Sequence, residues 1–182
     1  MTSSDATALS PGAVAEVGRR VGASFDGNPG RAAQAAGASV ALACAKFNGG
    51  ITERLVDGAL RAFDKHGLPA QSVEVAWVPG AFELPVAAAR LAASGRVRAV
   101  VALGAVIRGD TAHFEYVAGP CAQGLQRVAL DSGVPVVFGV LTTEDVDQAL
   151  ARSGAGDDNK GYEAAVTALE MADLVDGLGM RG

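Results

Sequence analysis

The sequence predicts an α/β domain with a four-stranded parallel sheet, and two observations support this prediction. From residue 40 onward, strongly apolar runs alternate with amphipathic segments, and such runs are typical of strands buried on both faces of a sheet. The chain has 182 residues, of which 49% are hydrophobic and 19% charged, so it suits one packed domain with a single core. The expected strands are residues 39–47, 72–79, 98–107 and 134–142.

The first two helices are expected after the first and second strands. In residues 49–67, Leu55, Ala59 and Phe63 recur at intervals of four and would form one apolar face. Gly67 would end this helix. The next helix is expected within residues 80–95, where Pro85 suits a first-turn position because its missing N–H would have no intrahelical partner.

The stretch GAVIRGDT after the third strand has the glycine and threonine spacing of a P-loop, GxxxxGK[ST], but Asp110 replaces the lysine. Residues 105–107 continue a β-prone run, which leaves only 108–111 as a turn. Asp110 or Thr111 is then the expected N-cap of the following helix, and Pro120 is expected to kink that helix. The motif predicts a strand, a tight turn and a helix N-terminus.

The remaining elements follow the fourth strand. Glu144 and Asp145 suit the start of a short helix that ends near Ser153. A polar loop then leads to a last helix over residues 159–175, whose apolar stripe contains Ala165, Leu169 and Ala172. The predicted domain covers residues 40–177, preceded by a largely mobile extension, 1–39, and followed by a tail, 178–182.

Composition excludes several classes of function. The formal net charge is -5 with scattered cations, so we expect neither a nucleic-acid partner nor a membrane partner. The apolar run 99–107 is about half the length of a membrane span. Cys44 and Cys121 form no CxxC pair, so neither a metal site nor a disulfide is expected. The N-terminus lacks the pattern of a secretory signal, which favours a cytoplasmic location.

Ligands of open parallel sheets bind outside the carboxyl ends of the strands. Four loops fall at this edge: Phe47 with Asn48, residues 79–83, residues 108–113, and the segment after Phe138. Free N–H groups at the start of the helix after Gly109 could hold a phosphate without a lysine from a P-loop.

Individual side chains at this edge have both a functional and a structural interpretation. Arg152 and Lys160 flank a polar loop and could bind phosphate, although surface cations are usually only solvated. His113, in a first helical turn, would be a neutral imidazole suited to proton transfer, or an ordinary surface residue. Glu83 is a second candidate for acid–base chemistry, or its carboxylate caps the N-terminus of the following helix. Phe47 and Phe138 could stack on a planar ligand or belong to the core.

Five segments, in this order and with this spacing, resemble the 6,7-dimethyl-8-ribityllumazine synthases of riboflavin biosynthesis. They are KFNGGITERLVDGA, VPGAFELP, GAVIRGDTAHFEYV, QGLQRVALDSGVPVVFGVLTTE and NKGYEAAVTALEMA, and they span about residues 40–175. The combination of VPGAFELP, IRGDTAHFE and FGVLTTE is highly specific.

The resemblance implies a three-layer flavodoxin-like sandwich that assembles into pentamers, which in some members build an icosahedral shell. It implies condensation of 5-amino-6-ribitylaminouracil with 3,4-dihydroxy-2-butanone 4-phosphate, without a cofactor, and riboflavin synthase as a further partner. His113 would relay protons, and Arg152, Lys160 and Phe138 would come from the neighbouring subunit. The other implied binding residues are Phe47, Asn48, Ala81, Phe82, Glu83, Ala105, Val106, Ile107, Asp110 and Thr111.

The sequence departs from the usual family pattern at three places. Asp110 puts a carboxylate beside the implied phosphate, and Pro120 interrupts a helix. Between Arg152 and Lys160, SGAGDDN replaces the commoner AGTKAGN, which adds negative charge and would weaken phosphate binding. The alternatives are a non-catalytic relative that binds lumazine or flavin or only builds a shell, and a generic nucleotide binder. The missing P-loop lysine and GxGxxG pattern disfavour the latter.

Overall fold

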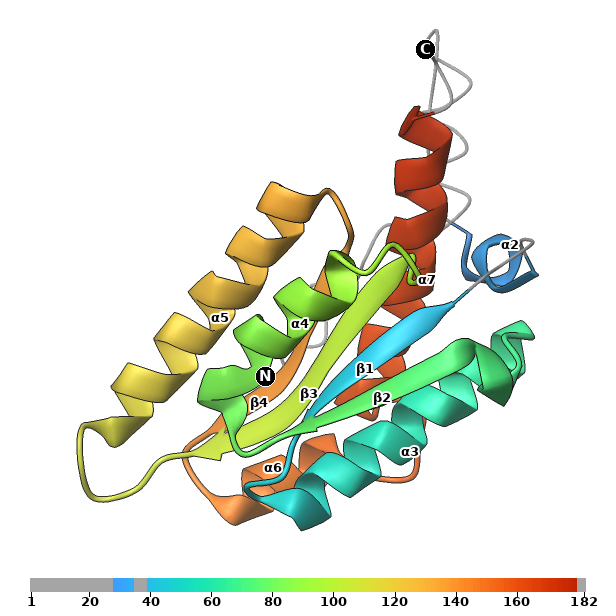
Figure 1. Cartoon of the computed structure of the whole chain (residues 1–182). Helices are drawn as coiled ribbons and strands as arrows, with labels where there is room; N and C mark the ends of the chain where they lie inside the picture. Colours follow the sequence, from blue (N-terminus) through green and yellow to red (C-terminus); the bar gives the residue numbers. More distant parts are fainter. Residues whose placement is uncertain (1–27, 35–38, 180–182) are drawn as a thin grey trace, which may run out of the picture.

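The computed structural model describes residues 28–34 and 39–179, in which four parallel strands form one sheet (Figure 1). The strand order is β2-β1-β3-β4, and the central strand β1 is buried at all six residues, which explains its continuous apolar run. The α/β class and the four predicted strands are confirmed. The strands are β1 Val40–Ala45, β2 Val73–Val78, β3 Ala99–Ile107 and β4 Val136–Thr143.

Helices cover both faces of the sheet and complete a three-layer sandwich of the flavodoxin-like kind (Figure 1). Successive residues of β1 point to opposite faces, so Leu42 and Cys44 belong to one core and Ala43 and Ala45 to the other. Helices α3 Gly49–His66, α6 Val146–Arg152 and α7 Lys160–Gly179 pack on the first core, and α4 Leu84–Ala92 and α5 His113–Ser132 on the second. Short 3₁₀ helices, η1 Ala70–Ser72 and η2 Ala81–Glu83, flank β2.

The helical stripes predicted from the sequence face the core. Leu55, Ala59 and Phe63 on α3 are at most 1% exposed. On α7, the predicted stripe of Ala165, Leu169 and Ala172 is likewise buried. Gly67 caps α3 with a left-handed φ of 85°, a conformation that glycine adopts without steric cost.

Two local predictions need correction. Helix α5 has Ala112 rather than Asp110 or Thr111 at its N-cap position, although the Thr111 hydroxyl accepts a long hydrogen bond from the His113 N–H. Pro120 lies inside this helix, which continues as far as Ser132, and the kink expected at Pro120 stays a prediction. Helix α7 extends to Gly179, so the first two residues of the expected tail are helical. None of the helices within residues 28–34 and 39–179 is long and apolar enough to cross a membrane.

The expected mobile extension contains a helix, α2 Pro29–Gln34, that packs on the domain. Ala32 and Ala33 are buried in the same core as α3 and α7. The Asp173 carboxylate on α7 accepts hydrogen bonds from Arg31 Nε at 2.7 and 2.9 Å and from the backbone N–H of Asn28 at 2.9 Å. Residues 28–34 of the expected extension thus pack on the domain, whereas residues 1–27 and 35–38 lie outside the described part of the chain.

Replacing Asp173 by Asn is expected to loosen α2 in a pH-dependent way. The Arg31 guanidinium, and to a lesser extent the Asn28 N–H, hold the pKa of Asp173 below its usual range. A carboxyl with a lowered folded-state pKa stabilises the fold above its unfolded pKa of about 4, and this stabilisation is lost as the pH falls through the folded-state pKa. Thermal unfolding should show a loss of about 1 to 2 kcal/mol for Asp173→Asn at pH 7.

That difference from the wild type should shrink toward zero below pH 4. The matched control is Asp131→Asn, which removes an exposed ion pair with Arg127 on α5 and should cost only about 0.3–0.5 kcal/mol. An equal loss of stability at pH 7 and pH 3 for Asp173→Asn would show that the charge of Asp173 does not hold α2.

Candidate active site

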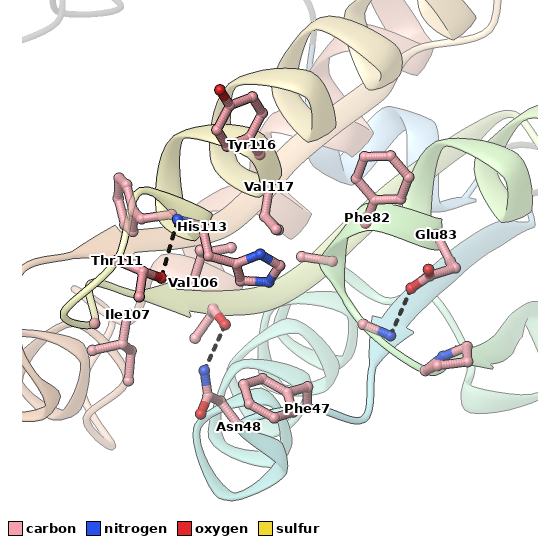
Figure 2. A pocket seen from close by; sticks show the side chains of 16 residues that line it. Phe47, Asn48, Phe82, Glu83, Val106, Ile107, Thr111, His113, Tyr116 and Val117 are labelled. Carbon is pink, nitrogen blue, oxygen red and sulfur yellow. Dashed lines mark hydrogen bonds between the residues drawn. The ribbon is translucent and has the colours of Figure 1, made fainter.

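A cavity of about 740 Å³ opens at the carboxyl ends of the strands (Figure 2). The chain passes from β1 to β2 on one side and from β2 across to β3 on the other. The connections that leave β1 and β3 therefore run to opposite sides of the sheet. Between them lies a crevice, which is where open α/β sheets bind their ligands. The cavity is lined from the loop after β1, the loop and 3₁₀ helix after β2, the end of β3 and the start of α5.

The structure brings ten of the fourteen predicted site residues together around this cavity. These ten are Phe47, Asn48, Ala81, Phe82, Glu83, Ala105, Val106, Ile107, Thr111 and His113. Four others, Asp110, Phe138, Arg152 and Lys160, do not line it.

Asn48 links the loop after β1 to the end of β3. Strand β1 ends at Ala45, whereas β3 continues to Ile107, so on this side the last carbonyls of β3 extend beyond their partner strand. Asn48 Nδ2 donates a hydrogen bond to the Ala105 carbonyl at 2.9 Å. This side-chain bond replaces the backbone hydrogen bond that a longer β1 would make to β3. Asn48 has a left-handed backbone with φ of 57°, which asparagine tolerates better than most residues.

Phe47 and Phe82 present aromatic surface to the cavity from two different loops. The Phe47 N–H donates to the Pro79 carbonyl at 3.0 Å, which joins the loops after β1 and β2. Phe47 is 72% exposed and Phe82 58% exposed. The interpretation of Phe47 as an ordinary core residue is therefore wrong, and both rings are open for stacking on a planar ligand.

Glu83 lines the cavity and also caps the backbone. One of its carboxylate oxygens accepts a hydrogen bond from the Gly80 N–H at 3.0 Å, which closes the turn that enters η2. The expectation that Glu83 serves as a cap is confirmed. Pro85 lies in the first turn of α4, as predicted.

The turn before α5 offers backbone N–H groups and a hydroxyl to the cavity. Gly109, Thr111 and His113 line it, and Figure 2 shows the His113 imidazole pointing into it. Thr111 Oγ1 accepts a long hydrogen bond of 3.4 Å from the His113 backbone N–H. Because the first turn of a helix has unpaired N–H groups and the positive end of the dipole, this arrangement favours an anion.

Arg108 holds the turn from outside the cavity. Its guanidinium pairs with Glu115 on α5 at 2.5 Å and with Glu144 after β4 at 2.7 Å. It also lies over the Phe114 ring, 4.1 Å from the centroid. Arg108 lowers the pKa of the Glu115 carboxyl below its usual range. Sequence reasoning gave Arg108 no role, although its place directly before the Gly109 turn was a usable signal.

The cavity contains no fixed positive charge. Among the described residues that line it there is neither a lysine nor an arginine. Arg152, at the end of α6, donates to the Gln148 carbonyl at 3.1 Å, and Lys160, at the start of α7, pairs with Glu163 at 2.7 Å. Phe138 lies on the edge strand β4 and is 41% exposed. One chain thus supplies the anion turn and the imidazole but not the expected cations.

Other side chains of the cavity were not predicted. Phe114, Tyr116 and Val117 line it from the first turns of α5. Tyr116 is 72% exposed and lies three residues after His113, a spacing that places both on one helical face. This spacing was visible in the sequence.

Neither cysteine lines the cavity. Cys44 and Cys121 are both buried and unpaired, and burial raises the pKa of their thiols to about 12 and about 11. Because the thiolate is the reactive form, neither cysteine is a nucleophile at neutral pH. No cluster of three or more metal-binding side chains occurs within the described ranges.

Comparison with known protein families decides the assignment. The family model of 6,7-dimethyl-8-ribityllumazine synthase matches residues 37–176, which is most of the chain. The chain belongs to this family. The lumazine synthase match begins just before β1, ends within α7 and includes every loop of the cavity as well as Arg152 and Lys160. Membership places the chain among the enzymes of riboflavin biosynthesis, and α2 precedes the matched range.

Proposed function

We propose that the chain condenses 5-amino-6-ribitylaminouracil with 3,4-dihydroxy-2-butanone 4-phosphate to give 6,7-dimethyl-8-ribityllumazine, phosphate and water. One observation carries the proposal. In this chain of the lumazine synthase family, the same cavity is lined by exposed aromatic rings, by a turn suited to an anion and by an imidazole that points inward. Each of these features suits one part of the two substrates.

The pyrimidine would stack on Phe47, and its edge and ribityl chain would lie along Ala81, Phe82 and the end of β3. Phe47 is open to solvent, and residues 105–107 line the same cavity. The phosphate would lie at the turn of Gly109 and Thr111, at the start of α5. Asp110 lies in the same turn but does not line the cavity.

The missing cations would come from a second copy of the chain. A dianionic phosphate is bound better with a fixed cation than by a helix N-terminus alone, and none lines the cavity. Arg152, Lys160 and the exposed Phe138 would enter from the neighbouring subunit of a homo-oligomer built of pentamers. The proposed partners are thus the two substrates, other copies of this chain and riboflavin synthase, in the cytoplasm and without a cofactor.

In the proposed mechanism the cavity holds two reactants in register. The 5-amino group attacks the ketone and forms an imine with loss of water, after which phosphate leaves from the four-carbon unit. The ribitylamino nitrogen then closes the ring, and a further water is lost. The His113 imidazole points into the cavity and would carry protons between the substrates. Holding the two reactants close together in the correct orientation would supply much of the rate enhancement.

His113→Ala is expected to slow turnover by about ten- to a thousandfold, because general acid–base assistance is lost. The measurement is formation of lumazine from the purified substrates, followed by absorbance and fluorescence and corrected for the uncatalysed condensation. His66→Ala is the matched control, since His66 lies at the end of α3 and does not line the cavity. An unchanged rate in His113→Ala would remove the imidazole from the mechanism.

The wild-type rate tests the proposal itself. Turnover well above the uncatalysed reaction would support an enzyme. A correctly assembled oligomer that binds lumazine or flavin but reacts at the background rate would contradict catalysis and favour the alternative of a binding or shell-forming relative.

A further inference from the structure

The loop of residues 153–159 joins α6 to α7 and lies between Arg152 and Lys160. Its last residue, Asn159, is only 1% exposed. Asn159 Nδ2 donates to the Arg54 carbonyl at 3.0 Å and to the Gly154 carbonyl at 2.7 Å. Its Oδ1 accepts from the N–H groups of Gly161 at 2.8 Å and Tyr162 at 3.2 Å. One buried amide thus connects the loop, the first turn of α7 and the helix α3.

Glycines on both sides allow this close fit. A Cβ atom at Gly58 of α3 would lie 2.2 Å from Asn159 Oδ1, and one at Gly161 would lie 2.0 Å from the Leu55 carbonyl oxygen. The loop and the start of α7 are therefore in direct contact with the backbone of α3. Because a buried amide with four partners has few alternative positions, Asn159 restrains the loop on α3.

Two cations of α3 hold the outer side of the same loop. Arg61 donates to the carbonyls of Ala155 at 2.5 Å and Gly156 at 3.3 Å. Lys65 pairs with Asp157 at 2.7 Å, and this pairing raises the pKa of Lys65 and lowers that of Asp157. These contacts are exposed and contribute less than the buried amide. They turn the charge of Asp157 toward α3, which reduces its expected repulsion of phosphate.

We propose that Asn159 is a positioning residue for phosphate binding. By fixing the loop to α3 it sets the places from which the side chains of Arg152 and Lys160 extend. The inference rests on the proposed function, in which these two cations reach the phosphate of a substrate bound mainly by the neighbouring chain. Long side chains can turn, but the position of their Cα atoms limits where both charges converge.

The test is the kinetics of Asn159→Ala in the assembled full-length enzyme. We expect the KM for the butanone phosphate and the inhibition constant for inorganic phosphate to rise about tenfold or more, since small displacements of charged groups are costly. The KM for the ribitylaminouracil should change little, because the cavity wall that binds it lacks Asn159. Gly58→Ala displaces the same amide without removing it and should act in the same direction.

Two controls separate positioning from general loss of stability. Asp158→Ala changes an exposed neighbour in the same loop and removes one of its added negative charges, so it should raise neither constant. Leu169→Ala removes a buried side chain of α7 and should lower the melting temperature without weakening phosphate inhibition. If Asn159→Ala cannot be assembled, Gly58→Ala with the same controls decides the question.

The outcomes distinguish this inference from the proposed function. An inactive wild type would overturn the function. An active wild type whose phosphate inhibition is unchanged in Asn159→Ala or Gly58→Ala would overturn only the positioning role. An equal weakening in Leu169→Ala would also overturn it, because the effect would then follow from reduced stability.

Discussion

Mixed oligomers of Arg152→Ala and His113→Ala chains are expected to form lumazine faster than oligomers of either variant alone. The reason is the distribution of the site over two copies of the chain. His113 lines the cavity, whereas Arg152 does not. In the proposed assembly, one chain gives the imidazole and its neighbour gives the guanidinium.

Each variant alone should be strongly impaired. Loss of the Arg152 guanidinium removes two parallel, charge-assisted hydrogen bonds to the phosphate. We expect turnover to fall by about a hundredfold or more, as when other preorganised hydrogen-bond donors are removed. In a random ring of equal parts of the two chains, about a quarter of the sites would combine an intact His113 with an intact Arg152. Activity should therefore recover to about a quarter of the wild-type value.

The experiment is coexpression of two differently tagged chains, isolation of the mixed oligomer and measurement of lumazine formation. A mixture of Arg152→Ala and Lys160→Ala chains is the matched control. Because one neighbour would supply both cations, no site in this mixture is complete and no recovery is expected. Absence of recovery in the first mixture, with mixed assembly verified, would show that His113 and Arg152 act from the same chain.

Much of the fold could be predicted from the sequence, because burial leaves local patterns. The strands β1 and β3 are covered on both faces and appear as continuous apolar runs. The stripe of Leu55, Ala59 and Phe63 marks the buried side of α3. Most of the cavity wall followed from one rule, since residues directly after parallel strands meet at one edge of the sheet.

Other features depend on contacts between distant parts of the chain. Helix α2 has six residues, too few for a clear periodicity, and its Arg31 is held by Asp173, 142 positions away. The amide of Asn159 contacts Arg54 across 105 positions. None of these contacts leaves a local pattern in the sequence.

Gly161→Ala is expected to have the largest effect on stability. A Cβ atom at this position would lie 2.0 Å from the Leu55 carbonyl oxygen and 2.7 Å from its Cα. These are backbone atoms of α3, so no side-chain rotation can relieve the clash and the first turn of α7 must move outward. We expect a loss of about 3 kcal/mol or more, the upper part of the range for overpacked cores. The melting temperature of a chain of this size should then fall by roughly 6–12 °C.

Gly50→Ala is the matched control for Gly161→Ala, because both glycines lie in the first turn of a helix. A Cβ atom at Gly50 would meet nothing within 4 Å, so alanine should keep or raise the stability, by up to about 1 kcal/mol, through its better helix propensity. Calorimetric melting at one protein concentration compares both variants with the wild type. Equal melting temperatures for Gly161→Ala and the wild type would show that α7 does not pack backbone to backbone on α3. The outward movement of α7 would also displace Lys160. The close packing of α7 on α3 at Gly161 therefore also determines where Lys160 lies for the proposed phosphate site.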